Sequence, residues 1–83
     1  MPTVAIVDGV KIAVYANDHP PAHFHAKFAE HQAVFDVRTL EMVRGSIPPA
    51  KKRRVLQWAQ TRKVELSRAF DRVRAKQHVE PIE

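Results

Sequence analysis

The sequence predicts an α+β fold, in which an antiparallel meander of four to five short strands packs against a long C-terminal helix. Residues 3–45 contain short apolar or alternating runs separated by turn residues, a pattern typical of strands. The runs are joined by short connections, which favour antiparallel neighbours. After Pro49 no proline or glycine occurs until Pro81, which favours a helix. The 83 residues are expected to form one domain, with strands at about 3–45 and the helix at about 48–78.

The first two predicted strands form a hairpin. Thr3–Val7 is apolar and rich in β-branched residues, and Asp8-Gly9 follows it directly. This dipeptide between apolar runs is a strong signal for a two-residue hairpin turn. Val10–Tyr15 is then the return strand.

The third predicted strand, His23–Phe28, has two different faces. Phe24, Ala26 and Phe28 alternate with His23, His25 and Lys27, so one face is expected to be buried and the other to carry imidazoles. A polar, proline-stiffened loop over Asn17–Ala22 precedes it. The remaining expected elements are a turn at 29–31, a strand at Gln32–Arg38, a turn at 39–41 and a strand at Met42–Gly45.

The predicted helix has one apolar stripe. Ser46 is the expected N-cap, and Pro48 and Pro49 suit a first turn. At 100° per residue, the apolar side chains within about 60° of one another are Val55, Ala59, Leu66, Phe70 and Val73. An unbroken helix over 49–78 would be roughly 45 Å long. Because a small sheet cannot cover that length, its C-terminal turns are expected to project, kink or pack on another chain.

Composition excludes several classes of protein. Cysteine is absent, so there is neither a disulfide framework nor a thiolate zinc site. No apolar stretch approaches the roughly 20 residues that span a membrane, and the N-terminus lacks the pattern of a signal peptide. The expected location is the cytoplasm, without membrane contact.

The basic charge lies in the C-terminal part. Residues 1–50 carry four Lys/Arg against five Asp/Glu, whereas residues 51–83 carry ten against four. Such asymmetry is compatible with a nucleic acid or an acidic protein as partner, and equally with a solvated helix. The contiguous Lys51, Lys52, Arg53 and Arg54 are the candidate nucleic-acid-binding residues.

The candidate catalytic residues are Asp18, His19, His23 and His25. His-x-His on a strand places two imidazoles on one face, and the preceding loop brings a third imidazole and a carboxylate close in sequence. Imidazole is a common ligand of divalent transition metals and a usual general base. His19, His23 and His25 are therefore candidate ligands of such a metal, with Asp18 as a further one; a catalytic site needs about three protein ligands and an open position.

Two other interpretations of this cluster stay open. In the first, the histidines and Asp18 cleave RNA by metal-free acid–base catalysis, with Arg53 or Arg54 stabilising the transition state and Tyr15 assisting. In the second, Asp18 caps backbone amides of a rigid turn, and the imidazoles form hydrogen bonds and shape a surface for a partner.

The run from Asn17 to Ala26, NDHPPAHFHA, resembles the signature of a small bacterial family, domain of unknown function 4160. The opening Met1-Pro2-Thr3, the order of the elements and the helical Leu56-Gln57-Trp58 resemble it too, so the resemblance covers nearly the whole chain. Family members usually have glycine where this chain has Ala29 and Leu40, so these two turns are expected to differ.

The resemblance implies a genetic context. Genes of this family often lie beside a second small gene, an arrangement that looks like a toxin–antitoxin pair. It implies a small cytoplasmic protein that contacts RNA, DNA or a cognate small protein through its basic helix. A histidine-centred hydrolase and a non-catalytic module that dimerises through its helix are the alternatives, and a homodimer is among the expected partners.

Overall fold

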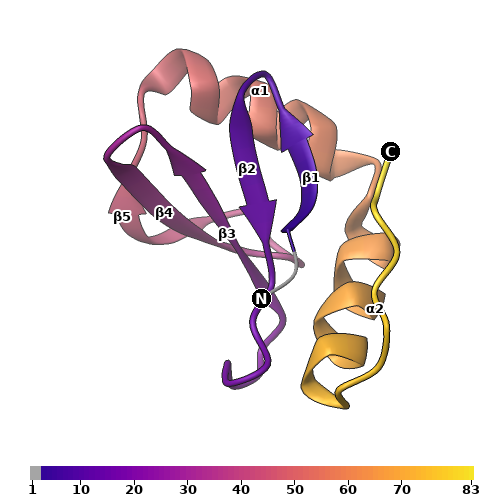
Figure 1. The fold of residues 1–83 in the computed structure, drawn as a ribbon. Helices are drawn as coiled ribbons and strands as arrows, with labels where there is room; N and C mark the ends of the chain where they lie inside the picture. Colours follow the sequence, from indigo (N-terminus) through magenta and orange to yellow (C-terminus); the bar gives the residue numbers. More distant parts are fainter. Residues whose placement is uncertain (1–2) are drawn as a thin grey trace.

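The computed structural model describes residues 3–83 and has one five-stranded antiparallel sheet and two helices (Figure 1). The predicted α+β class is confirmed. Met1 and Pro2, part of the family resemblance, lie outside the described residues. The elements are β1 (Thr3–Val7), β2 (Val10–Ala13), β3 (His23–Phe28), β4 (His31–Asp36), β5 (Met42–Ser46), α1 (Pro49–Gln60) and α2 (Lys63–Arg74).

The strands follow one another in the order β1-β2-β3-β4-β5, so the sheet is a meander. The predicted hairpin turn is present: Val7 pairs with Val10, and Asp8 and Gly9 have φ of 50° and 80°. These positive values are the signature of the turn that matches the twist of a hairpin. β2 ends at Ala13, two residues before the predicted end of this strand.

The two turns that carry Ala29 and Leu40 have left-handed backbones. Ala29 has φ of 53° and Leu40 of 61°. Glycine adopts this conformation without strain, whereas a residue with a Cβ does not. The glycine that the resemblance implies at both positions would suit these turns, which this chain forms with larger residues.

The prediction of one long helix is wrong, because the helical segment breaks after Gln60 and resumes at Lys63. A straight helix of roughly 45 Å would exceed the longest dimension of the molecule, 33 Å. The break lets both halves turn their apolar stripe towards one core, and all five stripe residues are buried. Of the three expected outcomes for the C-terminal turns, the kink is closest to this structure.

Side chains at the break bind one of the last carbonyl groups of α1. The Trp58 carbonyl accepts hydrogen bonds from Nη1 of Arg62 at 3.0 Å and from the Thr61 hydroxyl at 3.4 Å. The guanidinium of Arg62 also lies over the Trp58 ring. A helix end needs such partners because its final carbonyls have no intrahelical donor, and neither proline nor glycine was needed to produce this one.

The predicted N-cap is also wrong. Ser46 belongs to β5, and the N-cap residue of α1 is Pro48, which makes no side-chain capping bond. Pro49 is the first helical residue, where the missing N–H costs nothing.

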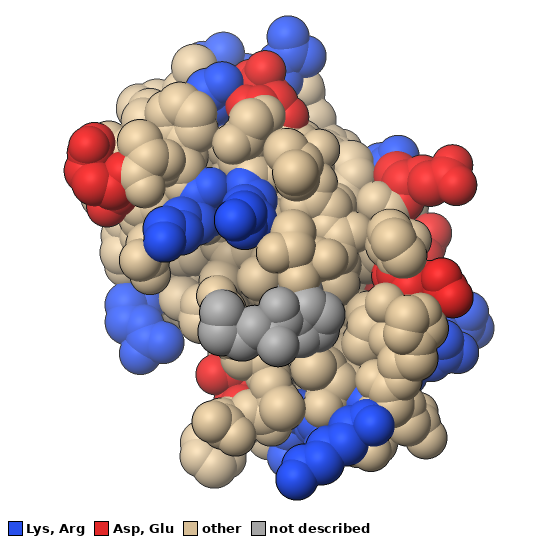
Figure 2. All heavy atoms as spheres, in the orientation of Figure 1, with Lys and Arg blue, Asp and Glu red and all other residues tan. Residues whose placement is uncertain are grey.

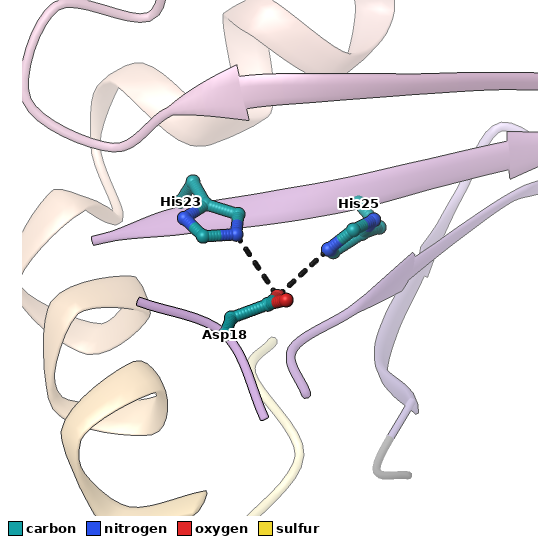
Figure 3. Close-up of side chains that lie close together, drawn as sticks. All are labelled: Asp18, His23 and His25. Atoms are coloured by element: carbon teal, nitrogen blue, oxygen red, sulfur yellow. Dashed lines mark hydrogen bonds and ion pairs between the residues drawn. The ribbon is translucent and has the colours of Figure 1, made fainter. Parts of the chain in front are cut away.

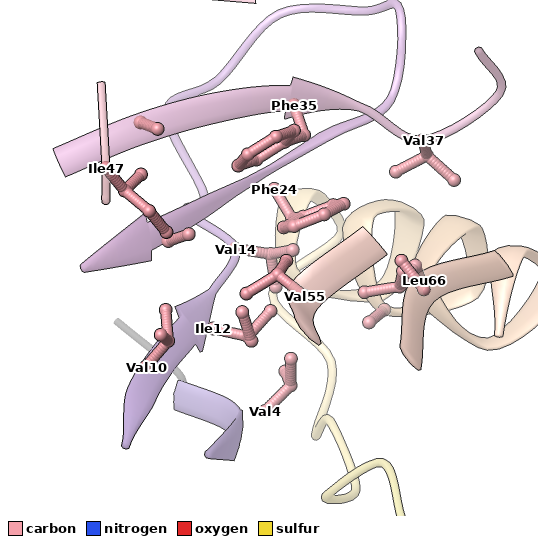
Figure 4. Packing of buried hydrophobic residues seen from close by; sticks show 14 of the residues in the cluster. Val4, Val10, Ile12, Val14, Phe24, Phe35, Val37, Ile47, Val55 and Leu66 are labelled. Carbon is pink, nitrogen blue, oxygen red and sulfur yellow. The ribbon is translucent and has the colours of Figure 1, made fainter. Parts of the chain in front are cut away.

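The core lies between the sheet and the helices (Figure 4). We call the side of the sheet that faces α1 and α2 the covered face. Its largest fully buried side chains are Phe24, Phe35, Ile12, Val10 and Val14, and they meet Val55 and Leu66 of the helices. The opposite side, which we call the open face, carries His23, His25 and Lys27 of β3.

The C-terminal tail runs back along α2 towards β1 (Figure 1). The Ile82 N–H donates to the Val4 carbonyl at 2.7 Å, and Arg62 donates from Nε to the Glu83 carbonyl. The tail therefore lies against the outer edge of β1. Within residues 3–83, no helix has the length and apolar character that crossing a membrane requires.

Candidate functional site

Three of the four candidate site residues converge on the open face (Figure 3). Oδ2 of Asp18 lies 2.9 Å from Nε2 of His23 and 2.8 Å from Nε2 of His25. One potential ligand atom from each residue lies within 4.8 Å of the other two. All three side chains are partly buried, with 16–23% of their surface exposed. We call Asp18, His23 and His25 the triad.

The strand and the loop each supply part of the triad. His23 and His25 are two residues apart on β3, so strand geometry places both imidazoles on one face. Asp18 comes from the loop between β2 and β3, where its N–H lies 3.3 Å from the Tyr15 carbonyl oxygen. The Tyr15 ring meets His25 edge-on at a centroid distance of 4.4 Å. The loop therefore carries the carboxylate to a position above the strand.

Each nitrogen of the His23 ring faces an acceptor. Nδ1 lies 3.0 Å from the Pro21 carbonyl, which can only accept, so Nδ1 carries a proton. Nε2 faces Asp18. The ring also packs against Phe70 of α2, at a centroid distance of 5.2 Å. These contacts fix both the orientation of the ring and the nitrogen that faces the triad.

The carboxylate of Asp18 is held in its charged form. Burial alone would raise the pKa of Asp18, but the hydrogen bond from His25 and the nearby charges of His23 and His25 outweigh it, so the pKa is lowered. A carboxylate that stays ionised supplies a negative charge between the two imidazoles. The alternative in which Asp18 caps turn amides matches Asp36 instead, whose Oδ1 accepts from the N–H groups of Arg38 and Thr39.

The structure places His19 beside the triad and outside it. His19 is exposed, and the converging group contains only Asp18, His23 and His25 among residues 3–83. His19 instead lines a shallow hollow of about 360 Å³ on the open face. The other lining residues are Pro21, His23, Val34, Asp36, Val43 and Arg44.

The four contiguous basic residues do not form one surface. Successive residues of an α-helix point about 100° apart, so these side chains leave α1 in four directions. Nζ of Lys51 donates to the Asp8 carbonyl at 2.8 Å, lies 3.3 Å from its carboxylate and sits over the Phe28 ring. Arg53 and Arg54 are exposed, but α1 packs on the covered face, away from the imidazoles.

Sequence reasoning missed two neighbours of the histidines. Phe70 was expected only as core, and Arg44 was not singled out. The register Ala13–His25–Val34–Arg44 across four strands places Arg44 in the same row as His25. No local sequence signal marks either residue, because both neighbours come from distant segments.

The comparisons with known proteins identify a family and no activity. The family model described as Domain of unknown function (DUF4160) matches residues 9–71, which include the whole triad. No curated protein and no solved structure matches the chain.

Proposed function

The chain belongs to the Domain of unknown function (DUF4160) family, and we propose that it is a hydrolase whose divalent transition metal is held by Asp18, His23 and His25. The observation that carries this proposal is the convergence of the three ligand atoms within 4.8 Å. Two imidazoles and one carboxylate leave coordination positions open for water and substrate, as in catalytic zinc and non-haem iron sites. With neutral imidazoles, the carboxylate gives the set a negative charge that attracts a cation.

The hydrogen bond from Nδ1 of His23 to the Pro21 carbonyl supports a ligand role. Imidazoles that bind a metal through one nitrogen commonly donate the other N–H to a carbonyl or carboxylate, which fixes the tautomer. The same bond leaves the Nε2 lone pair of His23 directed at the triad centre. Imidazole donors favour zinc, nickel or copper over magnesium. A metal bound there supplies a Lewis acid and a water that ionises near neutral pH.

The geometry supports metal-free acid–base cleavage less well. Asp18 is ionised and can only accept, so without a metal both Nε2 atoms must donate to the same carboxylate oxygen. Neither imidazole would then be free to take a proton from a substrate.

Metal binding by untagged protein tests the proposal. Titration with Zn²⁺ and with Co²⁺, whose visible spectrum reports its ligands, should give one site per chain. His25→Ala removes one of three ligands and should weaken binding by well over tenfold. His78→Ala is the matched control, because His78 is exposed and, within residues 3–83, its ion-pair partner is Glu80. Metal-dependent hydrolysis of bis(4-nitrophenyl) phosphate should be lost with His25→Ala alone.

Two outcomes would contradict this function. If neither metal binds untagged protein at neutral pH, the triad has only a structural role and joins the loop to β3 by hydrogen bonds. If His25→Ala and His78→Ala weaken binding equally, the metal binds exposed histidines and the triad is not its site.

A second proposed function is binding of a cognate small protein, encoded by the neighbouring gene of a toxin–antitoxin-like pair in the cytoplasm. One observation favours it. β5 pairs with β4 on one side, and no strand among residues 3–83 pairs on its other side. Val43 is 58% exposed on this strand, and an unpaired edge is a ready template for strand addition.

Co-purification with the product of the neighbouring gene tests this second function. Val43→Lys places a charge on the free strand and should reduce co-purification. Val64→Lys is the matched control, because Val64 is 60% exposed on α2. Toxicity on expression of this chain alone, relieved by the neighbouring gene, would assign the roles within the pair. Equal loss of co-purification in both variants would exclude the β5 edge.

A further inference from the structure

The open face carries three cations around the triad that the proposed metal centre does not use. Lys11 of β2 and Lys27 of β3 are direct cross-strand neighbours, and both are exposed. Lys27 lies two residues from His25 on the same face, and Arg44 lies two strands from His25 in the same row. One strand spacing is about 4.8 Å and two residues along a strand about 7 Å. The backbone positions of Lys11 and Lys27 are therefore about 5 Å apart, and those of Lys27 and Arg44 lie about 7 Å and about 10 Å from that of His25.

These cations are free of acidic partners. No Asp or Glu among residues 3–83 lies within ion-pair distance of Lys11, Lys27 or Arg44. Figures 1 and 2 view the sheet from the side opposite α1, and in Figure 2 one group of Lys or Arg side chains lies over the middle strands, while the other Lys and Arg and most Asp and Glu lie towards the rim. In contrast to Lys51, which is already paired with Asp8, these groups are available to an anion.

The hollow beside the triad adds a second kind of binding surface. Its lining combines the apolar side chains of Pro21, Val34 and Val43 and the exposed ring of His19 with one acidic and one basic side chain, Asp36 and Arg44. A flat ring with polar edges fits between an apolar wall and an imidazole, and aromatic rings stack on bases. A duplex buries its bases, so only an unpaired strand can place one there.

We propose that the open face binds single-stranded nucleic acid, with phosphates on Lys11, Lys27 and Arg44 and one base in the hollow beside His19. This inference rests on the proposed hydrolase function and names its substrate class. The reaction is then hydrolysis of a phosphodiester. The oxygen of water forms a new bond to phosphorus, and the bond from phosphorus to the leaving sugar oxygen breaks. One proton of the water passes to that leaving oxygen, and the product is a phosphate monoester.

Fluorescence anisotropy with metal-free protein and labelled 12-mers of RNA and DNA tests the surface without cleavage. The triple variant Lys11→Gln, Lys27→Gln, Arg44→Gln should bind more than tenfold more weakly. With three fewer phosphate contacts at about 0.7 each, the slope of log affinity against log salt should fall by about 2. The control Arg53→Gln, Arg54→Gln, Arg68→Gln removes the same charge from exposed helix positions and should change affinity less than threefold.

A second pair of variants tests the hollow. His19→Ala should weaken binding at least fivefold if a base stacks on this ring, whereas His78→Ala should not. RNA and DNA are tested separately, and the nucleic acid that binds more tightly is the expected substrate. A duplex of the same sequence should bind more weakly than the single strand.

The outcomes separate this inference from the metal proposal. His25→Ala should lose metal and cleavage while keeping single-strand affinity, and binding without any metal would leave the open-face assignment intact. Equal losses in the two triple variants would overturn it, because binding would then follow net charge alone. Polyglutamate that competes as well as the single strand would also overturn it in favour of an acidic protein.

Discussion

The two faces of β3 carry different kinds of chemistry on one six-residue strand. Phe24 and Ala26 are fully buried under the helices, whereas His23 and His25 are partly exposed and meet the carboxylate of a loop. The covered face is completed by α1 and α2, whereas the open face is completed by the loop immediately before the strand together with Phe70 of α2 beside His23. Stability should therefore depend on the first face and chemistry on the second, although neighbouring residues build both.

The largest expected effect on stability comes from a substitution on the covered face. Phe24→Ala removes a fully buried ring that stacks on Phe35 at a centroid distance of 5.3 Å. The cavity and the lost burial should lower the free energy of unfolding by about 3–5 kcal/mol. Urea denaturation followed by circular dichroism measures this change. A loss below about 1 kcal/mol would mean that the helices do not hold this ring as the structure shows.

The next largest effect is expected on the open face, at His25, which follows Phe24 in the sequence. His25→Ala removes a partly buried hydrogen bond to a charged group and should lower the free energy of unfolding by about 1–2 kcal/mol, while metal binding is lost. The same urea experiment compares it directly with Phe24→Ala. If His25→Ala destabilises as much as Phe24→Ala and leaves metal affinity unchanged, the imidazole is structural.

Measuring the free energy of unfolding at several pH values compares the two faces without a substitution on the covered face. The pKa of Asp18 is lowered in the folded state, so its stabilisation is complete above the unfolded value of about 3.9. It is lost as the pH falls through the folded pKa. Asp18→Asn should reduce the acid-induced loss of stability between about pH 5 and pH 2. Asp71→Asn, at an exposed carboxylate, is the control, and equal pH profiles for both variants would argue against the triad.

The smallest expected effect concerns the turn that sets which residues of β3 face which side. Ala29 has φ of 53°, a conformation that costs about 1–2 kcal/mol for a residue with a Cβ. Ala29→Gly should raise the free energy of unfolding by about 0.5–1 kcal/mol, after the greater freedom of glycine in the unfolded chain is subtracted. Ala16→Gly, at an exposed loop position without positive φ, should lower it instead. The difference between the two thermal melts checks the turn.

Local pattern predicted most of the fold. The alternation in His23–Phe28 and the Asp8-Gly9 turn identified the sheet, and the apolar stripe identified the buried helical residues. Helix-breaking residues could not predict where the helix ends, because neither Thr61 nor Arg62 is proline or glycine. The break follows from tertiary packing, which requires both helical halves to reach a sheet much shorter than one continuous helix.

The candidate site was predicted in part. The His-x-His spacing placed His23 and His25 on one face, and sequence proximity brought Asp18 to them. Proximity could not show that Asp18 turns towards the imidazoles while the adjacent His19 turns to the hollow. The direction of a side chain in an irregular loop depends on backbone angles that no periodic pattern encodes.

The hydrogen bond from Ile82 to Val4 has a consequence for assembly. The tail that makes this bond covers part of the β1 edge, so among residues 3–83 the β5 edge is the more open one for strand-to-strand association of identical chains. Two copies that join β5 to β5 form a closed pair related by a twofold axis, and growth stops there. A chain whose tail detaches from β1 would present two different edges, and β1-to-β5 contacts could then repeat without limit into a fibre.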